Sequence, residues 1–153
     1  MNMAAVRPLA RADRAGWEAL WAGYNHFYQR SLPAAVTDAT WSRFFDADEP
    51  VHAAVAEQDG RLVGLVHYLF HRSTGAIGPV CYLQDLFTDP AARGGGVGGA
   101  LIGFVYAEAA AAGSARVYWH THESNEVAMR LYDRVAERSG FVRYVKDFAP
   151  GGG

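Results

Sequence analysis

The chain has 153 residues, of which 50% are apolar and 20% charged, with a net charge of −2. We expect one globular domain over residues 1–153, burying about 70% of its extended-chain surface. The near-neutral charge and the lack of a basic cluster argue against a nucleic-acid partner. No apolar run approaches the roughly 18 residues of a membrane helix, and the N-terminus has no apolar signal core, so we expect a cytoplasmic protein without a membrane segment.

The first 30 residues predict a short strand over residues 6–8, followed by an amphipathic helix. Aromatic and apolar side chains recur there at steps of three and four residues, the spacing of one helix face. The face consists of Trp17, Leu20, Trp21, Tyr24, Phe27 and Tyr28. We expect Trp17, Leu20 and Phe27 to pack in the core, whereas the hydroxyl groups of Tyr24 and Tyr28 are free to line a binding site.

A second helix and a hairpin follow. Residues 37–45 predict a helix that begins with Thr37 or Asp38 as its N-cap. Strand patterns over residues 51–58 and 61–71 flank Asp59-Gly60, which is a strong turn signal for a β-hairpin. His67 and His71 have the even spacing of ordinary sheet residues.

The second half alternates strands and helices, which indicates an α/β fold. Cys81 lies in an apolar strand, so we expect a core residue rather than a nucleophile. The expected elements are a strand over 80–88, a helix over 97–112, a strand over 116–121, a helix over 125–139 and a strand over 141–148.

The turn between the 80–88 strand and the next helix is rich in glycine. Its glycines are Gly94, Gly95, Gly96, Gly98 and Gly99. Without Cβ atoms, the backbone N–H groups of the first helical turn can approach an anion at the positive end of the helix dipole. The turn therefore predicts a phosphate or pyrophosphate site, with a flexible surface turn as the alternative.

Three phosphate-binding patterns compete for these glycines. A P-loop is excluded, because no Lys and Ser or Thr follow the glycines. Gly94, Gly96 and Gly99 satisfy a dinucleotide fingerprint, but that fold carries its fingerprint in the first βα turn. The third pattern is Arg/Gln-x-x-Gly-x-Gly/Ala, which Arg93, Gly96 and Gly98 satisfy.

This third pattern resembles the acyl-CoA pyrophosphate loop of the GNAT acetyltransferases, and the resemblance extends from about residue 6 to residue 148. A second block, with Asn125, Tyr132 and Gly140-Phe141 in the expected order, is similar to the same superfamily. The resemblance implies an α/β fold of the layered α+β kind, the GNAT acyl-CoA N-acyltransferase fold. Its central sheet is mixed, with helices on both faces.

The resemblance also implies acetyl-CoA as co-substrate and no metal. The residues that it implies for acetyl-CoA binding are Leu86, Phe87, Thr88, Arg93, Gly94, Gly95, Gly96, Val97, Gly98, Gly99 and Asn125. Backbone N–H groups of the 86–88 stretch would stabilise the oxyanion, and Tyr132 would be the general acid for the leaving thiolate. A plain helix cap at Asn125 and a core aromatic at Tyr132 stay open as alternatives.

The general base is not defined by the sequence. Residues 83–87, Leu-Gln-Asp-Leu-Phe, partly resemble the polyamine acetyltransferases. These enzymes often carry Glu at the position of Gln84, and a glutamine cannot accept a proton from the amine. The remaining candidates are Asp85, Glu123, His120 and His122. We favour Asp85 and Glu123, and we expect no metal at the two histidines because a third ligand with suitable spacing is missing.

The acceptor is expected to be a small cationic amine, bound by Tyr24, Tyr28 and Gln84 with a carboxylate nearby. Acetylation of protein lysines or N-termini is the main alternative within the family. A non-catalytic acyl-CoA-binding module and a nucleotide-dependent oxidoreductase are the alternatives outside it. Family resemblance also makes a homodimer possible.

Overall fold

The computed structural model describes residues 3–148, which fall into two compact units. The larger unit is Met1–His120 and the smaller unit is Thr121–Gly153. Within residues 3–148, the sheet and three of the four α-helices belong to the larger unit, and the fourth helix belongs to the smaller unit.

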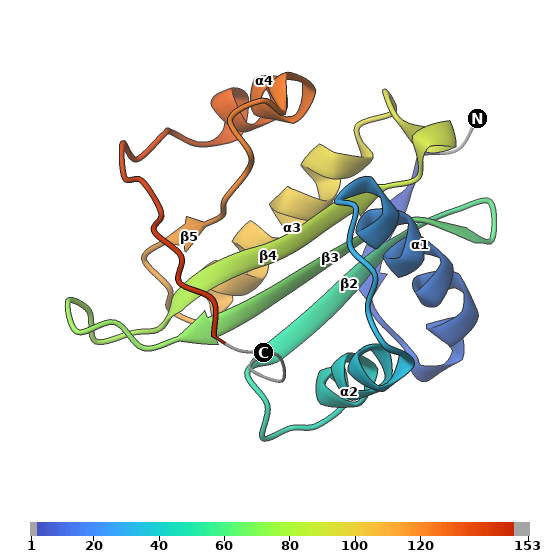
Figure 1. Ribbon diagram of the computed structural model, residues 1–153, viewed down its shortest axis with the longest axis horizontal. Coiled ribbons are helices and arrows are strands. Elements are labelled where there is room, and N and C mark those ends of the chain that lie inside the picture. Colours follow the sequence, from blue (N-terminus) through green and yellow to red (C-terminus); the bar gives the residue numbers. More distant parts are fainter. Residues whose placement is uncertain (1–2, 149–153) are drawn as a thin grey trace. The chain divides into compact units, whose positions relative to one another are not determined.

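The larger unit is built on a five-stranded sheet with the order β1-β2-β3-β4-β5 (Figure 1). The first three pairs of neighbours are antiparallel and the β4–β5 pair is parallel, so the sheet is mixed, as expected. The bounds predicted for β2, β3 and β4 are confirmed. The strands are β1 Ala5–Pro8, β2 Val51–Gln58, β3 Arg61–His71, β4 Val80–Thr88 and β5 Val117–Tyr118.

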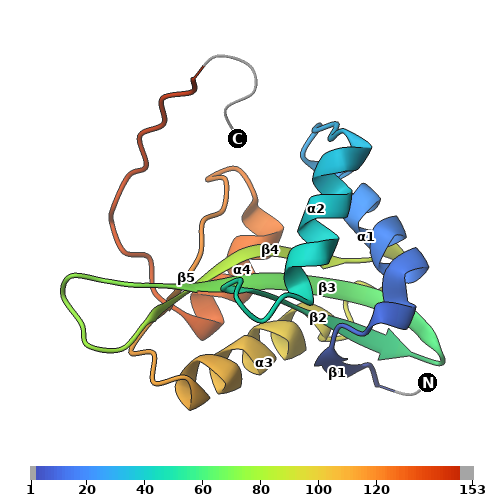
Figure 2. The same ribbon diagram turned by 90° about the horizontal axis from the view of Figure 1, so that it is seen from below.

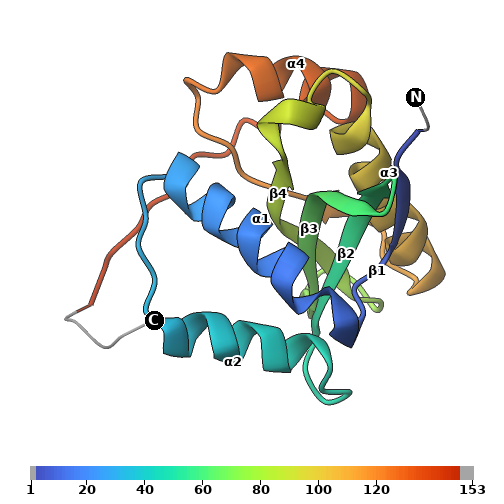
Figure 3. The same cartoon turned by 90° about the vertical axis from the view of Figure 1, so that its right-hand side faces the viewer.

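Helices cover both faces of this sheet. Figures 2 and 3 show α1 (Arg14–Phe27) and α2 (Ala34–Phe44) on one face and α3 (Val97–Ala111) on the other. Short 3-10 turns, Arg11–Asp13 and Pro90–Ala92, precede α1 and follow β4. Within residues 3–148, no helix combines the length and the apolar character that crossing a membrane requires.

The core between α1 and the sheet contains Trp17, Leu20, Trp21, Val55, Leu65 and Phe87. Their burial removes large aromatic surfaces from water, which is the main force holding α1 on β3 and β4. A Cβ atom at Gly23 would lie 3.0 Å from the Phe87 ring, so this glycine lets α1 approach β4 closely. The close approach brings the C-terminal half of α1 next to the middle of β4.

Two expectations for this region are wrong. Phe27, expected in the core, is 53% exposed because it lies in the last turn of α1, where the helix extends past the sheet. The second helix begins at Ala34, with Pro33 rather than Thr37 or Asp38 as N-cap. Proline fixes the φ angle of the entry residue at −60°, and the alanines that follow are strong helix formers, so the helix begins one turn earlier than the polar residues suggested.

The β5 strand is shorter than the predicted 116–121. Only Val117 and Tyr118 pair with β4, opposite Cys81 and Tyr82. The register between β3 and β4 shifts where His67 pairs with Asp85 and Tyr68 pairs with Leu83, which leaves Gln84 as an extra residue on β4. A bulge bends and twists its strand, and β4 pairs with β5 only before the bulge, at Cys81 and Tyr82.

The smaller unit contains α4, which spans Glu126–Val135 and is shorter than the predicted 125–139. Its C-cap is Ala136, whose backbone is extended. The predicted strand over 141–148 is wrong, because those residues carry no regular structure and Phe141 is 91% exposed. The alternating pattern was present, but a strand also requires a hydrogen-bonded neighbour, and the described part of this unit contains no other strand.

Candidate active site

The glycine-rich loop leads from β4 into α3. Asp89 opens it by accepting a hydrogen bond from the Ala91 N–H, and Gly96 is the N-cap of α3 with a φ of 80°. The first hydrogen bond of this turn runs from the Ala100 N–H to the Gly96 carbonyl, at 3.0 Å. The N–H groups of the three residues before Ala100 therefore precede the helical ladder, and this is the arrangement that binds anions at helix N-termini.

Some glycines of the loop are required by the backbone conformation, and others leave room for a ligand. Gly94 and Gly96 have positive φ angles of 87° and 80°, which only glycine adopts without strain. Gly95 has no such angle, and a Cβ there would meet only the Ala92 carbonyl oxygen, at 3.6 Å. Packing within the chain thus gives no reason for a glycine at position 95. A pyrophosphate lying against the backbone gives one, so the loop fits acyl-CoA.

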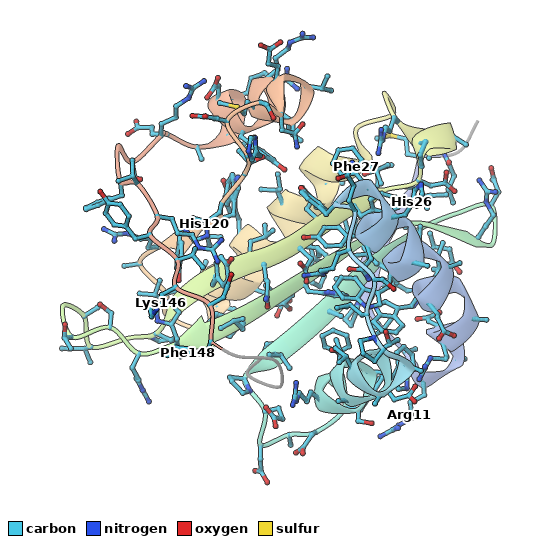
Figure 4. All side chains as sticks on the ribbon, viewed as in Figure 1. Arg11, His26, Phe27, His120, Lys146 and Phe148 are labelled. Carbon is cyan, nitrogen blue, oxygen red and sulfur yellow. The ribbon has the colours of Figure 1, made fainter. Side chains whose placement is uncertain are left out.

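Arg93 lies at the start of the same loop. Its guanidinium carbon is 5.9 Å from the centroid of the Phe27 ring and 6.0 Å from that of Phe87. Figure 4 shows Phe27 and His26 at the C-terminal end of α1. The exposed ring of Phe27 therefore supports a cation at the glycine-rich loop, a cation–π arrangement that keeps the positive charge in place.

The C-terminal half of β4 contains the stretch expected to supply oxyanion donors. Leu86, Phe87 and Thr88 pair with β3 along one edge. On the other edge, pairing with β5 stops at Tyr82, so within the described residues no strand partner covers the backbone of this stretch. Unpaired N–H groups on a rigid strand are suited to stabilise a developing negative charge.

The middle of β4 carries a buried carboxylate. Asp85 is 8% exposed, and its Oδ2 accepts a hydrogen bond from Nδ1 of His67 at 2.9 Å. The Nε2 atom of His67 lies 2.9 Å from Nε1 of Trp17. The three side chains come from β4, β3 and α1, and together they form a chain of hydrogen bonds through the core.

The direction of these hydrogen bonds defines the charge state of the site. A tryptophan N–H can only donate, so Nε2 of His67 is an acceptor and its proton is on Nδ1. His67 is therefore neutral and donates to Asp85 without neutralising it. The buried carboxyl group of Asp85 thus has no cationic partner in His67, an arrangement that favours a cationic ligand.

Two tyrosines lie close to this carboxylate, Tyr24 of α1 and Tyr28, the C-cap of the same helix. Burial and the negative charge of Asp85 raise the pKa of Tyr24, and the same two causes, in the same order, raise the pKa of Tyr28. The two rings are 4.8 Å apart, centroid to centroid. Both phenols stay protonated at neutral pH, so they can donate hydrogen bonds and present aromatic faces but cannot act as bases.

The expected residues thus divide between the two units. In the larger unit, Tyr24, Tyr28 and Asp85 come together, while Gln84 is the exposed bulge residue beside them. In the smaller unit, Asn125 is the N-cap of α4, and its Oδ1 accepts from the Ala128 N–H at 3.4 Å.

Two further site candidates belong to the smaller unit. Tyr132 is half-buried in α4, and Glu123 is exposed in the turn that precedes this helix. The roles expected for both residues stay predictions.

The two histidines considered as bases do not share a strand face. His120 lies next to β5 in the larger unit, where its Nδ1 is 3.2 Å from the Tyr82 hydroxyl (Figure 4). His122 lies in a turn of the smaller unit and bonds to Ser124 at 2.6 Å. β5 ends at Tyr118, so neither histidine lies in a strand.

Sequence reasoning missed the partners of Asp85. His67 had been expected to be an ordinary sheet residue, and Trp17 a simple core residue. Their distances in the sequence, 50 residues from Trp17 to His67 and 18 from His67 to Asp85, gave no local signal. The register of β3 against β4 would have paired His67 with Asp85, but this register depends on the bulge at Gln84.

Cys81 is buried, as expected of a core residue. Burial raises the pKa of its thiol to about 11, so the thiol stays protonated at neutral pH. It therefore has no place in the candidate chemistry.

Comparison with known proteins yields a family match. Residues 17–136 match the model of the acetyltransferase (GNAT) family. The chain is 34% identical over 144 residues to the D-amino-acid N-acetyltransferase HPA3 of Saccharomyces cerevisiae, covering 93% of this chain and 89% of that protein.

Solved structures share the fold at lower identity. The aminoglycoside acetyltransferase AAC(6')-Iy, in complex with a CoA bisubstrate analogue, superposes with a TM-score of 0.83 at 18% identity, covering 97% of this chain and 100% of that one. A ribosomal-protein-alanine N-acetyltransferase from Brucella melitensis biovar Abortus 2308 gives a TM-score of 0.77 at 20% identity, with coverages of 96% and 100%.

Proposed function

This chain belongs to the acetyltransferase (GNAT) family and is an acetyl-CoA-dependent N-acetyltransferase. From this premise we propose that it acetylates a primary amine of a small molecule, and that this amine binds next to the Asp85 carboxylate. The observation that carries the proposal is the buried Asp85 carboxylate, which a neutral His67 orients but does not neutralise. Such a charge is stabilised by an incoming ammonium group. The relatives named above as D-amino-acid and aminoglycoside acetyltransferases are consistent with a small amine as acceptor.

The residues around Asp85 suit an amine. The rings of Tyr24 and Tyr28 are close to the carboxylate, and aromatic faces attract an ammonium by roughly 0.5–2 kcal/mol. Asp85 can hold the ammonium and then accept its proton, directly or through one water molecule, which leaves the nitrogen lone pair free to attack. This assigns the role of general base to Asp85 rather than to Glu123.

Acetyl-CoA, when bound, supplies a thioester whose carbonyl carbon is attacked by the neutral amine and whose sulphur leaves as a thiolate. The glycine loop with Arg93 would hold its pyrophosphate, and backbone N–H groups of Leu86–Thr88 would donate to the developing oxyanion. The phenol of Tyr132 would donate a proton to the leaving sulphur, and Asn125 would hold the cofactor from the start of α4.

Acetylation of protein lysines and N-termini is the competing function within the family, and an acyl-CoA-binding module without transfer is the competing function outside it. The proposal differs from both because it requires turnover of free small amines. It also requires that this turnover depend on Asp85.

The test is thiol release from acetyl-CoA with a panel of amino acids, polyamines, aminoglycosides, arylamines and lysine peptides. We expect turnover of at least one small amine, and a loss of at least about tenfold in kcat for Tyr132→Phe with unchanged acetyl-CoA affinity. The matched control is Tyr144→Phe, which removes the phenol of a tyrosine that is 93% exposed.

Acetyl-CoA binding without turnover of any small amine would overturn the proposal, and exclusive use of lysine peptides would replace it by protein acetylation. If Tyr132→Phe keeps the wild-type kcat, Tyr132 is not the general acid. A failure to bind acetyl-CoA would overturn the interpretation of the glycine loop.

A further inference from the structure

Arg30 is held at the end of α1 by the backbone. Gln29 has a φ of 53°, an angle in the left-handed region that ends a helix, and the Arg30 N–H donates to the Asn25 carbonyl at 2.8 Å. The chain therefore turns back over the last turns of α1. This turn directs Arg30 toward Trp21 and Tyr24 of the same helix.

The guanidinium of Arg30 is fixed on three sides. Its Nε donates to Oδ1 of the buried Asn25 at 2.8 Å, while Nδ2 of Asn25 donates to the Trp21 carbonyl at 2.9 Å. Its central carbon lies 5.4 Å from the centroid of the Trp21 ring and 5.7 Å from that of Tyr24. A guanidinium held by one hydrogen bond over two aromatic rings is pre-organised to bind a planar anion with its outer N–H groups.

Within residues 3–148, Arg30 has no carboxylate partner. Among the described residues, none lies within ion-pair distance of its guanidinium, whereas Arg7 and Arg14 of the same unit are paired at 2.8 Å and 2.6 Å. The one hydrogen bond at its Nε leaves the terminal amino groups available. Immobilising an arginine costs side-chain entropy, and an anionic ligand would offset that cost.

Arg30 and Asp85 are connected through one cluster of rings, formed by Trp21, Tyr24 and His67. The Trp21 ring stacks on Tyr24 at 5.2 Å and contacts His67 at 5.0 Å, and His67 bonds to Asp85. Both charges act on the Tyr24 phenol, since Asp85 raises its pKa and Arg30 lowers it. One ligand spanning Tyr24 would meet a carboxylate at one end and a guanidinium at the other.

We propose that Arg30 binds the carboxylate of the acceptor, so that the acceptor is an amino acid whose ammonium group lies at Asp85. This inference rests on the proposed function, because it assumes that Asp85 holds the reacting amine. A guanidinium pairs with a carboxylate through two parallel charge-assisted hydrogen bonds. A polyamine would instead bring a second positive charge toward Arg30, so the arrangement selects zwitterions over polycations.

The test compares amino acids with their carboxamides, which keep the amine but lose the negative charge. We expect the wild type to prefer the acid, and Arg30→Gln to lower kcat/KM for the acid on the order of tenfold or more, chiefly through KM. For the carboxamide, Arg30→Gln should change kcat/KM little, so the preference for the acid over the carboxamide disappears in this variant. Arg30→Lys keeps the charge without the planar fork and should recover part of the preference.

Arg61→Gln is the matched control, because Arg61 is an exposed arginine of the same unit in the β2–β3 hairpin. Equal losses for acid and carboxamide in Arg30→Gln, with unchanged thermal unfolding, would overturn the role of Arg30 and leave the proposed function intact. A wild type that acetylates other amines but no amino acid would also overturn the inference. Turnover that does not depend on Asp85 would overturn the proposed function itself.

Discussion

The glycine loop and the Asp85 site occupy neighbouring parts of one strand–helix unit but are built in opposite ways. The loop residues follow one another in the chain, and the binding elements that we propose are their backbone N–H groups. The Asp85 site is assembled from side chains of α1, β3 and β4, which are separated by 50 and 18 residues along the sequence. One site depends on local conformation, and the other depends on how three elements pack.

This difference has consequences for the effects of mutations. A backbone site tolerates changes of side-chain chemistry but is sensitive to Cβ atoms and φ angles. A site of buried, hydrogen-bonded side chains is sensitive to the removal of any single donor or acceptor, because the remaining groups then lack partners. The variants below separate the two kinds of site.

The largest effect is expected for Asp85→Asn. The amide cannot accept a proton from the amine, so kcat/KM for the acceptor should fall on the order of 100-fold, while acetyl-CoA affinity stays at the wild-type value. The amide oxygen can still accept the His67 hydrogen bond, which limits the loss of stability. Steady-state kinetics and acetyl-CoA titration measure the two quantities.

Asp48→Asn is the control, since Asp48 is exposed in the turn before β2 and outside both sites. Wild-type kcat/KM in Asp85→Asn would remove Asp85 from the role of base. Equal losses of acceptor turnover and acetyl-CoA affinity would show that the two sites are not separable.

Three glycine variants give smaller effects and dissect the loop. Gly95→Ala places a methyl group in ordinary van der Waals contact with the Ala92 carbonyl oxygen, at 3.6 Å, without backbone strain, so acetyl-CoA should bind about tenfold more weakly with unchanged thermal unfolding. Gly96→Ala adds strain at a φ of 80°, so it should also lose about 1–2 kcal/mol of stability. Calorimetry and ligand titration separate these two effects.

Gly60→Ala completes the set, because Gly60 has a comparable φ of 78° and no atom within 4 Å of an added Cβ, but lies in the β2–β3 turn. It should lose stability like Gly96→Ala while keeping the affinity for acetyl-CoA. Unchanged acetyl-CoA affinity in Gly95→Ala would contradict the assignment of the loop as the pyrophosphate site.

The smallest effect concerns the pH dependence of stability. The folded state keeps Tyr24 protonated at pH values at which the unfolded chain ionises it, so the free energy of unfolding falls as the pH rises above about 10. Tyr24→Phe should make this alkaline fall shallower, as measured by denaturant unfolding at several pH values. The exposed Tyr144→Phe should leave the slope as in the wild type, and an equal slope in both variants would contradict the burial of Tyr24.

The sequence predicted those elements whose signals are local. Asp59-Gly60 and its flanking alternation located β2 and β3, and the apolar run before the glycines located β4. The predictions failed where a neighbour decides the structure. Residues 141–148 have the strand pattern without a strand partner in their unit, and β5 stops where the bulge at Gln84 ends its pairing.

By itself, the sequence determined the family, the glycine loop and the order of the elements, because a phosphate loop is a contiguous run of residues with a recognisable backbone requirement. It also singled out Asp85, Tyr24 and Tyr28 as candidates. Only the tertiary structure decided that His67 and Trp17 orient Asp85, and that Arg30 lies over the Trp21 and Tyr24 rings without a carboxylate partner among the described residues. The reason is physical, since hydrogen bonds between side chains of different elements depend on strand register and helix packing.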